Sequence, residues 1–229
     1  MIDIIDQNNL LSINSLLNED DMINKDDDKF RKLMFLYKSA QRELMTKLEI
    51  LKEELNEFYS YTPIEEITCR IKSYDSIIKK LNKKGYALTY GNLINNLNDV
   101  SGIRIVCNFK DDVYKIAELI ESFQDVRILE ERDYIKNPKK SGYRSFHLIV
   151  EVPVNFSRGI MFIRSEIQIR SLGMNFWSQL EHQINYKSEN DNASAKKRLM
   201  KYANIIDEID NKLSILSDDE LTKSKRFLN

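Results

Sequence analysis

The sequence holds few residues that turn or break a chain, with six glycines and three prolines among 229 residues. Because these residues punctuate helices and strands, their scarcity predicts long elements joined by short or charged loops. Two cysteines and two histidines are too few for a zinc site, and the cysteines lack the close pairing of a disulfide framework. No apolar run approaches the roughly 20 residues that span a bilayer, so we expect no membrane partner.

The charges are balanced rather than one-sided, with 35 Lys and Arg against 36 Asp and Glu. This balance argues against a nucleic-acid coat protein, so we expect no stable nucleic-acid partner and leave regulation by RNA open. The first ten residues are acidic, whereas a secretory signal would be basic and then apolar. We therefore expect a cytoplasmic protein.

Both ends of the chain have the pattern of helical arms. Apolar residues recur at helical spacing over residues 30–59, and again over 172–186 and 196–216. A shorter helix is expected near residues 9–17, followed by a charged connection. The last arm carries an apolar stripe that could pack on its own domain or form an oligomer interface. The stripe consists of Leu199, Tyr202, Ile206, Ile209 and Leu213.

The middle of the chain mixes strand and helix patterns. We expect strands at 66–72, 102–109, 125–134, 143–152 and 160–170, and helices at 74–84 and 112–122. The first strand is ambiguous, because Ile67 and Ile71 fit a helical seam as well as an alternating strand. Ser73 as an N-cap and Gly85 as a helix end favour a strand followed by a helix. The whole predicts an α/β or α+β sheet domain with helical arms.

Asp99 stands just before an expected strand, in the run Asp99-Val100-Ser101-Gly102-Ile103-Arg104. Magnesium takes one or two carboxylates together with phosphate oxygens, which such a carboxylate would suit. Aspartate is equally a favoured turn residue, so a structural role stays open. Glu166, Gln168 and Arg170 alternate on one strand face, which is either exposed to solvent or built around a polar ligand.

A third cluster is the run from Ser141 to His147. Tyr143, Ser145 and His147 share one face of the expected strand, and a tyrosine offers a stacking platform for a base. Lys139, Lys140 and Arg144 supply charge for phosphates, although a basic loop can also be merely solvated. The three clusters together offer a metal site, phosphate contacts and a base platform, which transfer between two nucleotides requires.

Residues 63–186 resemble the synthetase domain of RelA/SpoT-type enzymes, and the short chain resembles the small alarmone synthetases. The matching runs are Arg70-Ile71-Lys72 with Ser76 and Lys80, DVSGIRIVC, ERDYIKNPKKSGYRSFH and EIQIRSLGMNFWSQLEHQINYK. The resemblance implies a mixed five-stranded sheet flanked by helices, related to nucleotidyltransferases. It also implies Mg²⁺-dependent transfer of pyrophosphate from ATP to the 3′-hydroxyl of GDP, GTP or GMP, producing (p)ppGpp.

The resemblance also assigns residues. Asp99 and Glu166 would hold Mg²⁺, and Glu166 would accept the proton of the acceptor hydroxyl. The ATP site would consist of Arg70, Lys72, Ser76, Lys80 and Arg104. The guanine-nucleotide site would consist of Tyr143, His147, Gln168, Asn175, Arg132, Lys140 and Arg144.

Two other functions fit the residues less well. A template-independent nucleotidyltransferase would need an Asp-x-Asp pair after Gly-Ser on a strand, and the chain has that pair only at Asp26–Asp28, in a charged loop. A non-catalytic RNA-binding regulator would need neither Asp99 nor Glu166. No His-Asp dipeptide occurs, so we expect no hydrolase activity. Similar small synthetases form homotetramers, and we expect one here, built from the C-terminal extension.

These expectations divide the chain into three parts. They are an N-terminal helical extension at 1–60, a synthetase domain at 61–187 and a C-terminal helical extension at 188–229.

Overall fold

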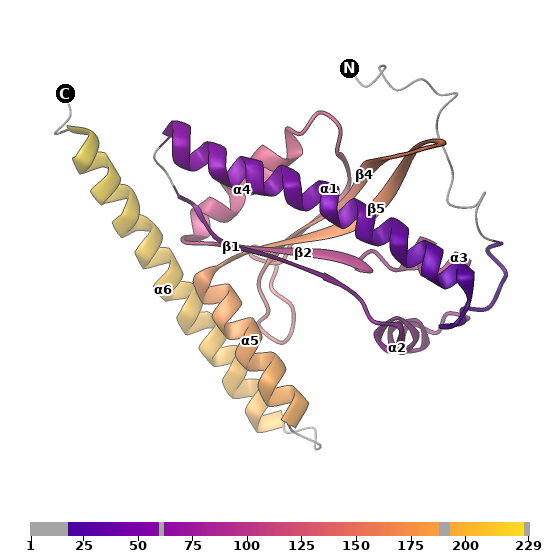
Figure 1. Cartoon of the computed structure of the whole chain (residues 1–229). Helices are drawn as coiled ribbons and strands as arrows, with labels where there is room; N and C mark the ends of the chain where they lie inside the picture. The colour runs from indigo at the N-terminus through magenta and orange to yellow at the C-terminus, as the bar shows by residue number, and fades with distance from the viewer. Residues whose placement is uncertain (1–17, 60–61, 188–192, 227–229) are drawn as a thin grey trace.

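A computed structural model describes residues 18–59, 62–187 and 193–226 (Figure 1). All the helices and strands expected between residues 30 and 216 occur, with shifted ends, and the helix expected near 9–17 lies outside the described residues. The elements in chain order are α1 (Asp28–Tyr59), β1 (Ile64–Ile71), α2 (Tyr74–Lys84), α3 (Tyr90–Asn96), β2 (Ser101–Cys107), α4 (Lys110–Glu121), β3 (Arg127–Asp133), β4 (Phe146–Phe156), β5 (Gly159–Ser171), α5 (Leu172–Lys187) and α6 (Ala193–Arg226).

The five strands form one mixed sheet in the order β1-β2-β5-β4-β3. Strands β2 and β5 are parallel, and the other neighbouring pairs are antiparallel. The β4–β5 hairpin turns at Gly159, whose φ of 140° is accessible to glycine without a steric cost. The predicted fold, a mixed five-stranded sheet flanked by helices, is confirmed.

Helices α1 and α4 cover one face of the sheet, α2 and α5 lie on the other side, and α6 packs against both α5 and α4 (Figure 1). The covered face is apolar, with Ile103, Ile105, Ile167 and Ile169 all buried. Complete burial of such a side chain stabilises the fold by about 1.5–3 kcal/mol. Helix α1 adds a buried stripe at helical spacing, formed by Leu33, Tyr37, Ala40, Leu44, Leu48 and Leu51.

The region of ambiguous pattern is a strand followed by a helix. The side chain of Ser73 caps α2 by accepting a hydrogen bond from the backbone of Ser76, and Gly85 ends the helix with a φ of 74°. The short helix α3 was not expected, because Gly91 and three asparagines give its seven residues a low helix propensity. Burial of Tyr90 and Leu93 holds it in place.

Strand β4 begins at Phe146, three residues later than expected. Gly142 has a φ of 92°, and residues 143–145 form a loop. The hydroxyl of Ser145 turns inward and donates to the carbonyl oxygen of Ile169 at 3.1 Å. Tyr143 therefore does not share a strand face with His147, and the prediction of a common strand was wrong.

Helix α5 follows β5 without a loop, and α6 packs alongside it (Figure 1). Trp177, Leu199 and Ala203 form a small core between the two helices, and the indole nitrogen of Trp177 donates to the carbonyl oxygen of Leu199 at 2.9 Å. Within the described ranges, no helix is long and apolar enough to cross a membrane.

Candidate active site

The face of the sheet opposite α1 and α4 carries a row of polar side chains. Residues paired across neighbouring strands point to the same face, so the strand register places the row directly. One line of partners crosses all five strands, from Arg132 through His147, Gln168 and Arg104 to Thr68. A second line joins Glu166 through Gly102 to Arg70. The sheet thus brings together residues from well-separated sequence segments.

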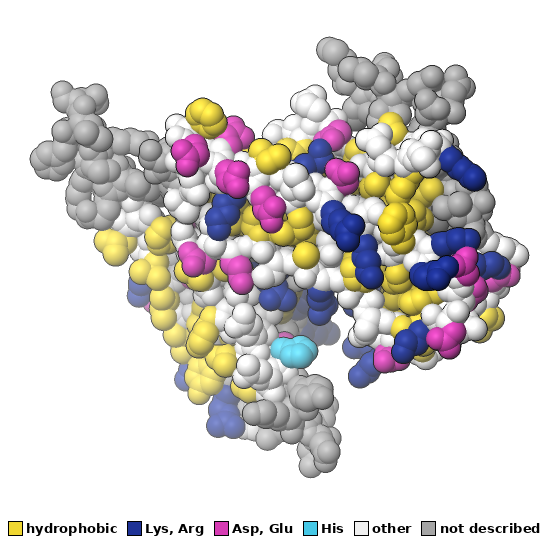
Figure 2. All heavy atoms as spheres, viewed as in Figure 1, with side chains coloured by type: hydrophobic (Ala, Val, Ile, Leu, Met, Phe, Trp, Pro, Cys, Tyr) yellow, Lys and Arg dark blue, Asp and Glu magenta, His cyan; other side chains and the backbone are white. Residues whose placement is uncertain are grey.

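A pocket opens on this face over β1, β2 and β5. Gly102 stands between Arg70 and Glu166, and the position of its missing Cβ has no neighbour closer than 3.8 Å. The glycine therefore leaves space for a ligand. Figure 2 shows lysine and arginine side chains gathered in a hollow between the α5–α6 arm and the lobe around α2. The pocket is lined by Thr68, Cys69, Arg70, Asp99, Gly102, Ile103, Arg104, Glu166 and Gln168.

Asp99 is held by two lysines at one end of the pocket. Its Oδ2 lies 2.8 Å from Nζ of Lys72, which follows β1, and 2.7 Å from Nζ of Lys80 on α2. Burial opposes ionisation of Asp99, but these hydrogen bonds and charges outweigh burial and lower its pKa. Its Oδ1 is buried and has no hydrogen-bond partner among the described residues. The carboxylate is therefore charged, with one oxygen available to a cation.

Glu166 belongs to a closed ring of hydrogen bonds. Its Oε1 lies 3.1 Å from Nδ1 of His147, and Nε2 of His147 lies 2.9 Å from the hydroxyl of Tyr143. That hydroxyl accepts from Nη2 of Arg170 at 2.7 Å. The same Nη2 donates to Oε1 of Gln168, whose Nε2 donates to Oε2 of Glu166, both at 2.7 Å. Five side chains thus fix one another's orientation.

The ring determines where its protons lie. Arg170 only donates, so the hydroxyl oxygen of Tyr143 accepts from it and its proton points to Nε2 of His147. The proton of a neutral His147 then sits on Nδ1 and is donated to Glu166. Burial alone would raise the pKa of Glu166, but the hydrogen bonds from His147 and Gln168 help to lower it. Glu166 is thereby held as an oriented carboxylate.

The basic residues of the pocket have few anionic partners. Burial, followed by the charges of Arg170 and Arg70, lowers the pKa of Arg104. The Nε atoms of Arg104 and Arg170 are buried without a hydrogen-bond partner among the described residues. Cations that repel one another in this way form a site ready for a polyanion.

Two residues that the family resemblance left unassigned, Arg170 and Lys139, belong to this site. Arg170 closes the ring around Glu166, although its alternation with Gln168 had marked it as facing a ligand. Nζ of Lys139 lies 4.3 Å from the ring centre of Tyr134 and 4.7 Å from that of Tyr143. A turn from Lys139 to Gly142, closed by a 2.8 Å backbone hydrogen bond, places it there. Glycine at the fourth position of Lys139-Lys140-Ser141-Gly142 is a turn signal that could have revealed this.

The remaining assigned residues lie around the pocket with varied contacts. Arg132 is bound to Glu130 of its own strand through two hydrogen bonds of 2.7 and 2.6 Å. Lys140 and Ser76 are exposed. Asn175 is buried on α5, with an Oδ1 that lacks a hydrogen-bond partner among the described residues. Arg144 contacts α6 instead of the pocket.

Two carboxylates and several cations around one sheet pocket define a protein that binds phosphorylated ligands. The chain belongs to the RelA/SpoT family, since the family profile described as "Region found in RelA / SpoT proteins" matches residues 69–191. The predicted family membership is thereby confirmed.

Curated relatives extend over most of this chain. GTP pyrophosphokinase YwaC of Bacillus subtilis is 40% identical over 164 residues, covering 72% of this chain and 78% of its own. GTP pyrophosphokinase YjbM of the same species is 35% identical over 189 residues, covering 82% and 88%.

Solved structures share the fold. A GTP pyrophosphokinase family protein from Streptococcus pneumoniae has a TM-score of 0.77 and 38% identity, covering 84% of this chain and 95% of its own. The small alarmone synthetase 1 of Bacillus subtilis, bound to its product pppGpp, also has a TM-score of 0.77, with 34% identity and coverages of 84% and 98%.

Proposed function

We propose that this protein is a GTP pyrophosphokinase that moves the β,γ-pyrophosphate of ATP onto the 3′-hydroxyl of GDP, GTP or GMP. The observation that carries the proposal is the joint presence in one pocket of Asp99, Glu166 and Arg104, whose Nε has no hydrogen-bond partner among the described residues. Relatives of similar length that bear the name GTP pyrophosphokinase, and a neighbouring structure bound to pppGpp, support it.

The donor ATP occupies the side of the pocket formed by β1, β2 and α2. Arg70 and Arg104 stand on adjacent strands with one position between them in register, which suits contact with both faces of an adenine. Lys72 and Lys80, which both contact Asp99, hold the phosphates together with Ser76 on α2. Both lysines already contact Asp99. An incoming triphosphate therefore competes with Asp99 for ammonium groups that are already oriented.

The donor set of the pocket fits Mg²⁺. No group of three or more metal-ligating side chains occurs in the part of the chain that the structure describes, but Mg²⁺ needs only one or two carboxylates and takes its other ligands from phosphates and water. Asp99, with its unpartnered Oδ1, and Glu166 would hold the ion. When bound, it neutralises negative charge on the transferred phosphoryl oxygens.

Glu166 acts as the general base. It takes the proton of the acceptor 3′-hydroxyl, the hydroxyl oxygen bonds to the β-phosphorus of ATP, and the bond from that phosphorus to the α,β-bridging oxygen breaks. AMP leaves with the bridging oxygen. His147 and Gln168 hold the Glu166 carboxylate in place through their hydrogen bonds.

The acceptor lies on the side of β4 and the 139–145 loop. Tyr143 provides the platform for guanine, because its hydroxyl is fixed by Arg170 and His147 while its ring lies beside the pocket. Lys139, Lys140 and Arg132 supply charge for the acceptor phosphates, and Asn175 supplies an amide from α5. Lys139 is added to the assigned set because its ammonium lies over the Tyr143 ring.

The decisive experiment is incubation of the protein with Mg²⁺, GDP and ATP labelled at the γ-phosphate, followed by separation of the nucleotides. The proposal expects labelled 3′-pyrophosphorylated guanine nucleotide and unlabelled AMP. Labelled free pyrophosphate with nucleotidyl transfer would indicate a nucleotidyltransferase, and no product would indicate a binding protein. We expect no release of pyrophosphate from purified ppGpp with Mn²⁺, since a hydrolase motif is missing from the sequence.

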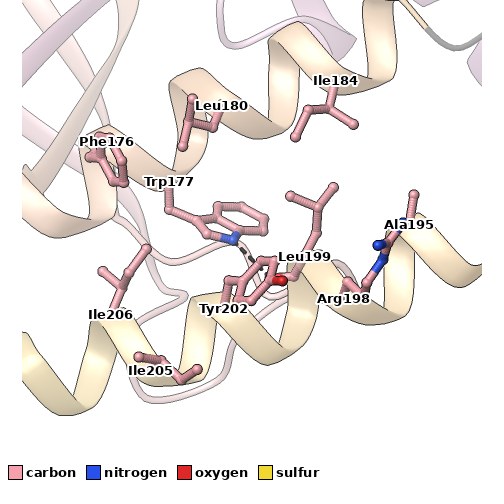
Figure 3. Close-up of a pocket in the computed structure, with 10 residues that line it drawn as sticks. All are labelled: Phe176, Trp177, Leu180, Ile184, Ala195, Arg198, Leu199, Tyr202, Ile205 and Ile206. Carbon is pink, nitrogen blue, oxygen red and sulfur yellow. Dashed lines mark hydrogen bonds between the residues drawn. The ribbon is translucent and has the colours of Figure 1, made fainter.

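We further propose that α5 and α6 join copies of this chain into a homo-oligomer, with a tetramer as the expected state. An apolar groove runs between the two helices (Figure 3). Its outer side chains are well exposed, including Phe176 at 55% and Tyr202 at 51%. Solvent contact of this extent favours burial against another apolar surface. The groove is lined by Phe176, Trp177, Leu180, Ile184, Ala195, Arg198, Leu199, Tyr202, Ile205 and Ile206.

A further inference from the structure

The loop that carries Tyr143 is packed tightly on α6. A Cβ at Gly142 would lie 2.7 Å from Cβ of Ala203 and 3.3 Å from Cα of Met200. Since real Cβ atoms essentially never approach so closely to another side-chain carbon, only glycine allows this contact, and its φ of 92° favours glycine as well. The height of the loop above the sheet is therefore set by the helix.

Arg144 fastens the loop to the same helix. Its Nη2 donates to Oδ1 of Asn204 at 3.1 Å, and its Nε lies 3.5 Å from Oδ1 of Asp207. Its Nη1 donates back to the carbonyl oxygen of Gly142 at 3.2 Å. Arg144 has a side chain only 12% exposed and is committed to the loop and to α6. Both terminal nitrogens of its guanidinium are hydrogen-bonded, while its buried Nε makes the ion pair with Asp207 and has no hydrogen-bond partner among the described residues.

We propose that Arg144 is a positioning residue that braces the Tyr143 loop against α6 through Asn204 and Asp207, so that α6 sets the affinity for the guanine acceptor. The inference rests on the proposed function for the identity of the acceptor. It replaces the phosphate contact that the family resemblance gave to Arg144.

The brace reaches the chemistry through Tyr143. On one side, this side chain packs against the core of Trp177, Leu199 and Ala203 between α5 and α6. On the other side, its hydroxyl is bonded to His147 and Arg170 in the ring around Glu166. A loop released from α6 would carry the Tyr143 ring away from the acceptor. The residues proposed for ATP lie on or next to β1, α2 and β2, so donor binding is independent of the brace.

A brace and a direct phosphate contact are two possible roles for Arg144, and they predict different effects of changing its partner Asn204. Asn204 is exposed on α6 and its side chain accepts a hydrogen bond from Arg144. Asn204→Ala therefore removes this part of the brace and leaves the guanidinium in place. We compare Arg144→Gln, Asn204→Ala and the double variant by calorimetry with GMP, GDP, GTP and a non-hydrolysable ATP analogue. Lys110→Met is the matched control, because Lys110 binds Asp207 at 2.8 Å without contacting the loop.

If Arg144 is a brace, each single variant should weaken the binding of GMP, GDP and GTP equally. The expected loss of affinity is about tenfold, the worth of a lost charged hydrogen bond. The double variant should lose no more affinity than Arg144→Gln alone, because the Arg144–Asn204 contact that Asn204→Ala removes is already absent in Arg144→Gln. Affinity for the ATP analogue and the behaviour of Lys110→Met should match the wild type. A loss that grows from GMP to GTP in Arg144→Gln, with Asn204→Ala unchanged, would establish a phosphate contact and overturn the brace.

Hydrogen exchange without nucleotide separates this inference from the proposed function. Asn204→Ala should speed amide exchange in residues 139–145, and unchanged exchange there would overturn the brace. If the wild type makes no alarmone, the proposed function fails, whereas the exchange result still decides the role of Arg144. If Arg144→Gln does not fold, the Asn204→Ala comparison decides it alone.

Discussion

Replacing Glu166 with glutamine tests the general base with the smallest change of shape. Both carboxylate oxygens accept hydrogen bonds, Oε1 from His147 at 3.1 Å and Oε2 from Gln168 at 2.7 Å. A glutamine offers one oxygen and one NH₂ group, so the NH₂ group would face a second hydrogen-bond donor, from either His147 or Gln168. Rotating the Gln168 amide by 180° would place an acceptor there, but it would break the 2.7 Å hydrogen bond that Arg170 donates to Oε1 of Gln168.

The expected size of the effect has two separate parts. Loss of the base should lower turnover by at least ~10²-fold, the lower end of the range for general-base catalysis. The buried donor without an acceptor should lower the free energy of unfolding by about 1–3 kcal/mol. For a chain of this length, each kcal/mol lowers the melting temperature by roughly 2–4 °C. The variant therefore stays folded and keeps its guanine platform, while catalysis is lost.

The assay measures turnover at saturating ATP, GDP and Mg²⁺, together with GDP binding by calorimetry and a thermal melt. Glu65→Gln is the control, since Glu65 is exposed on β1 and absent from the pocket lining. It makes the same chemical change and should leave turnover unaltered. If Glu166→Gln retains more than about a tenth of wild-type turnover, far above the range for a lost base, Glu166 is not the base.

Three further predictions concern other parts of the molecule. Tyr143→Ala should weaken GDP binding by about 1–3 kcal/mol, the worth of one base stack, and Tyr143→Phe should keep most of it; equal losses for ATP in calorimetry would assign Tyr143 a structural role. Ile205→Asp with Ile209→Asp should dissociate the oligomer in light scattering without touching the brace, and a wild type that is already monomeric would refute the interface. Burial raises the pKa of Asp210, so its contribution to stability is lost as pH rises through the folded-state pKa. Asp210→Asn should therefore gain in melting temperature over the wild type as pH rises from about 3, near the ordinary aspartate pKa, to neutrality, and a pH-independent difference would contradict this.

The sequence predicts the sheet well because its strands carry strong local patterns. Ile103, Ile105, Ile167 and Ile169 alternate with polar residues, and burial under α1 and α4 follows directly from that alternation. Helix α3 could not be predicted, since its seven residues are held by the burial of Tyr90 and Leu93 rather than by propensity. The conformation of such a segment depends on its tertiary contacts, which cannot be inferred from its local sequence.

In the candidate site, too, the sequence predicts the residues on strands better than those in loops. Residues on strands, such as Glu166, Gln168 and His147, fall on the predicted face because strand periodicity fixes their direction. Residues in the 139–145 loop do not follow a period, and a turn brings Lys139 rather than Lys140 over Tyr143. Arg144 is the sharpest example, because only the distant helix α6, some sixty positions later, explains where its guanidinium points.

The ring of hydrogen bonds joins Tyr143, the proposed acceptor platform, to Glu166, the proposed general base. With the Tyr143 hydroxyl accepting from Arg170, its proton is directed to His147, which in turn directs its own proton to Glu166. His147 could move its proton to Nε2, but the Tyr143 oxygen would then face two donors and its own proton would need a new acceptor. Placement of Tyr143 by the 139–145 loop therefore also selects the tautomer of His147 that orients the Glu166 carboxylate. The proposed acceptor platform and the proposed general base are thus held by one network of hydrogen bonds.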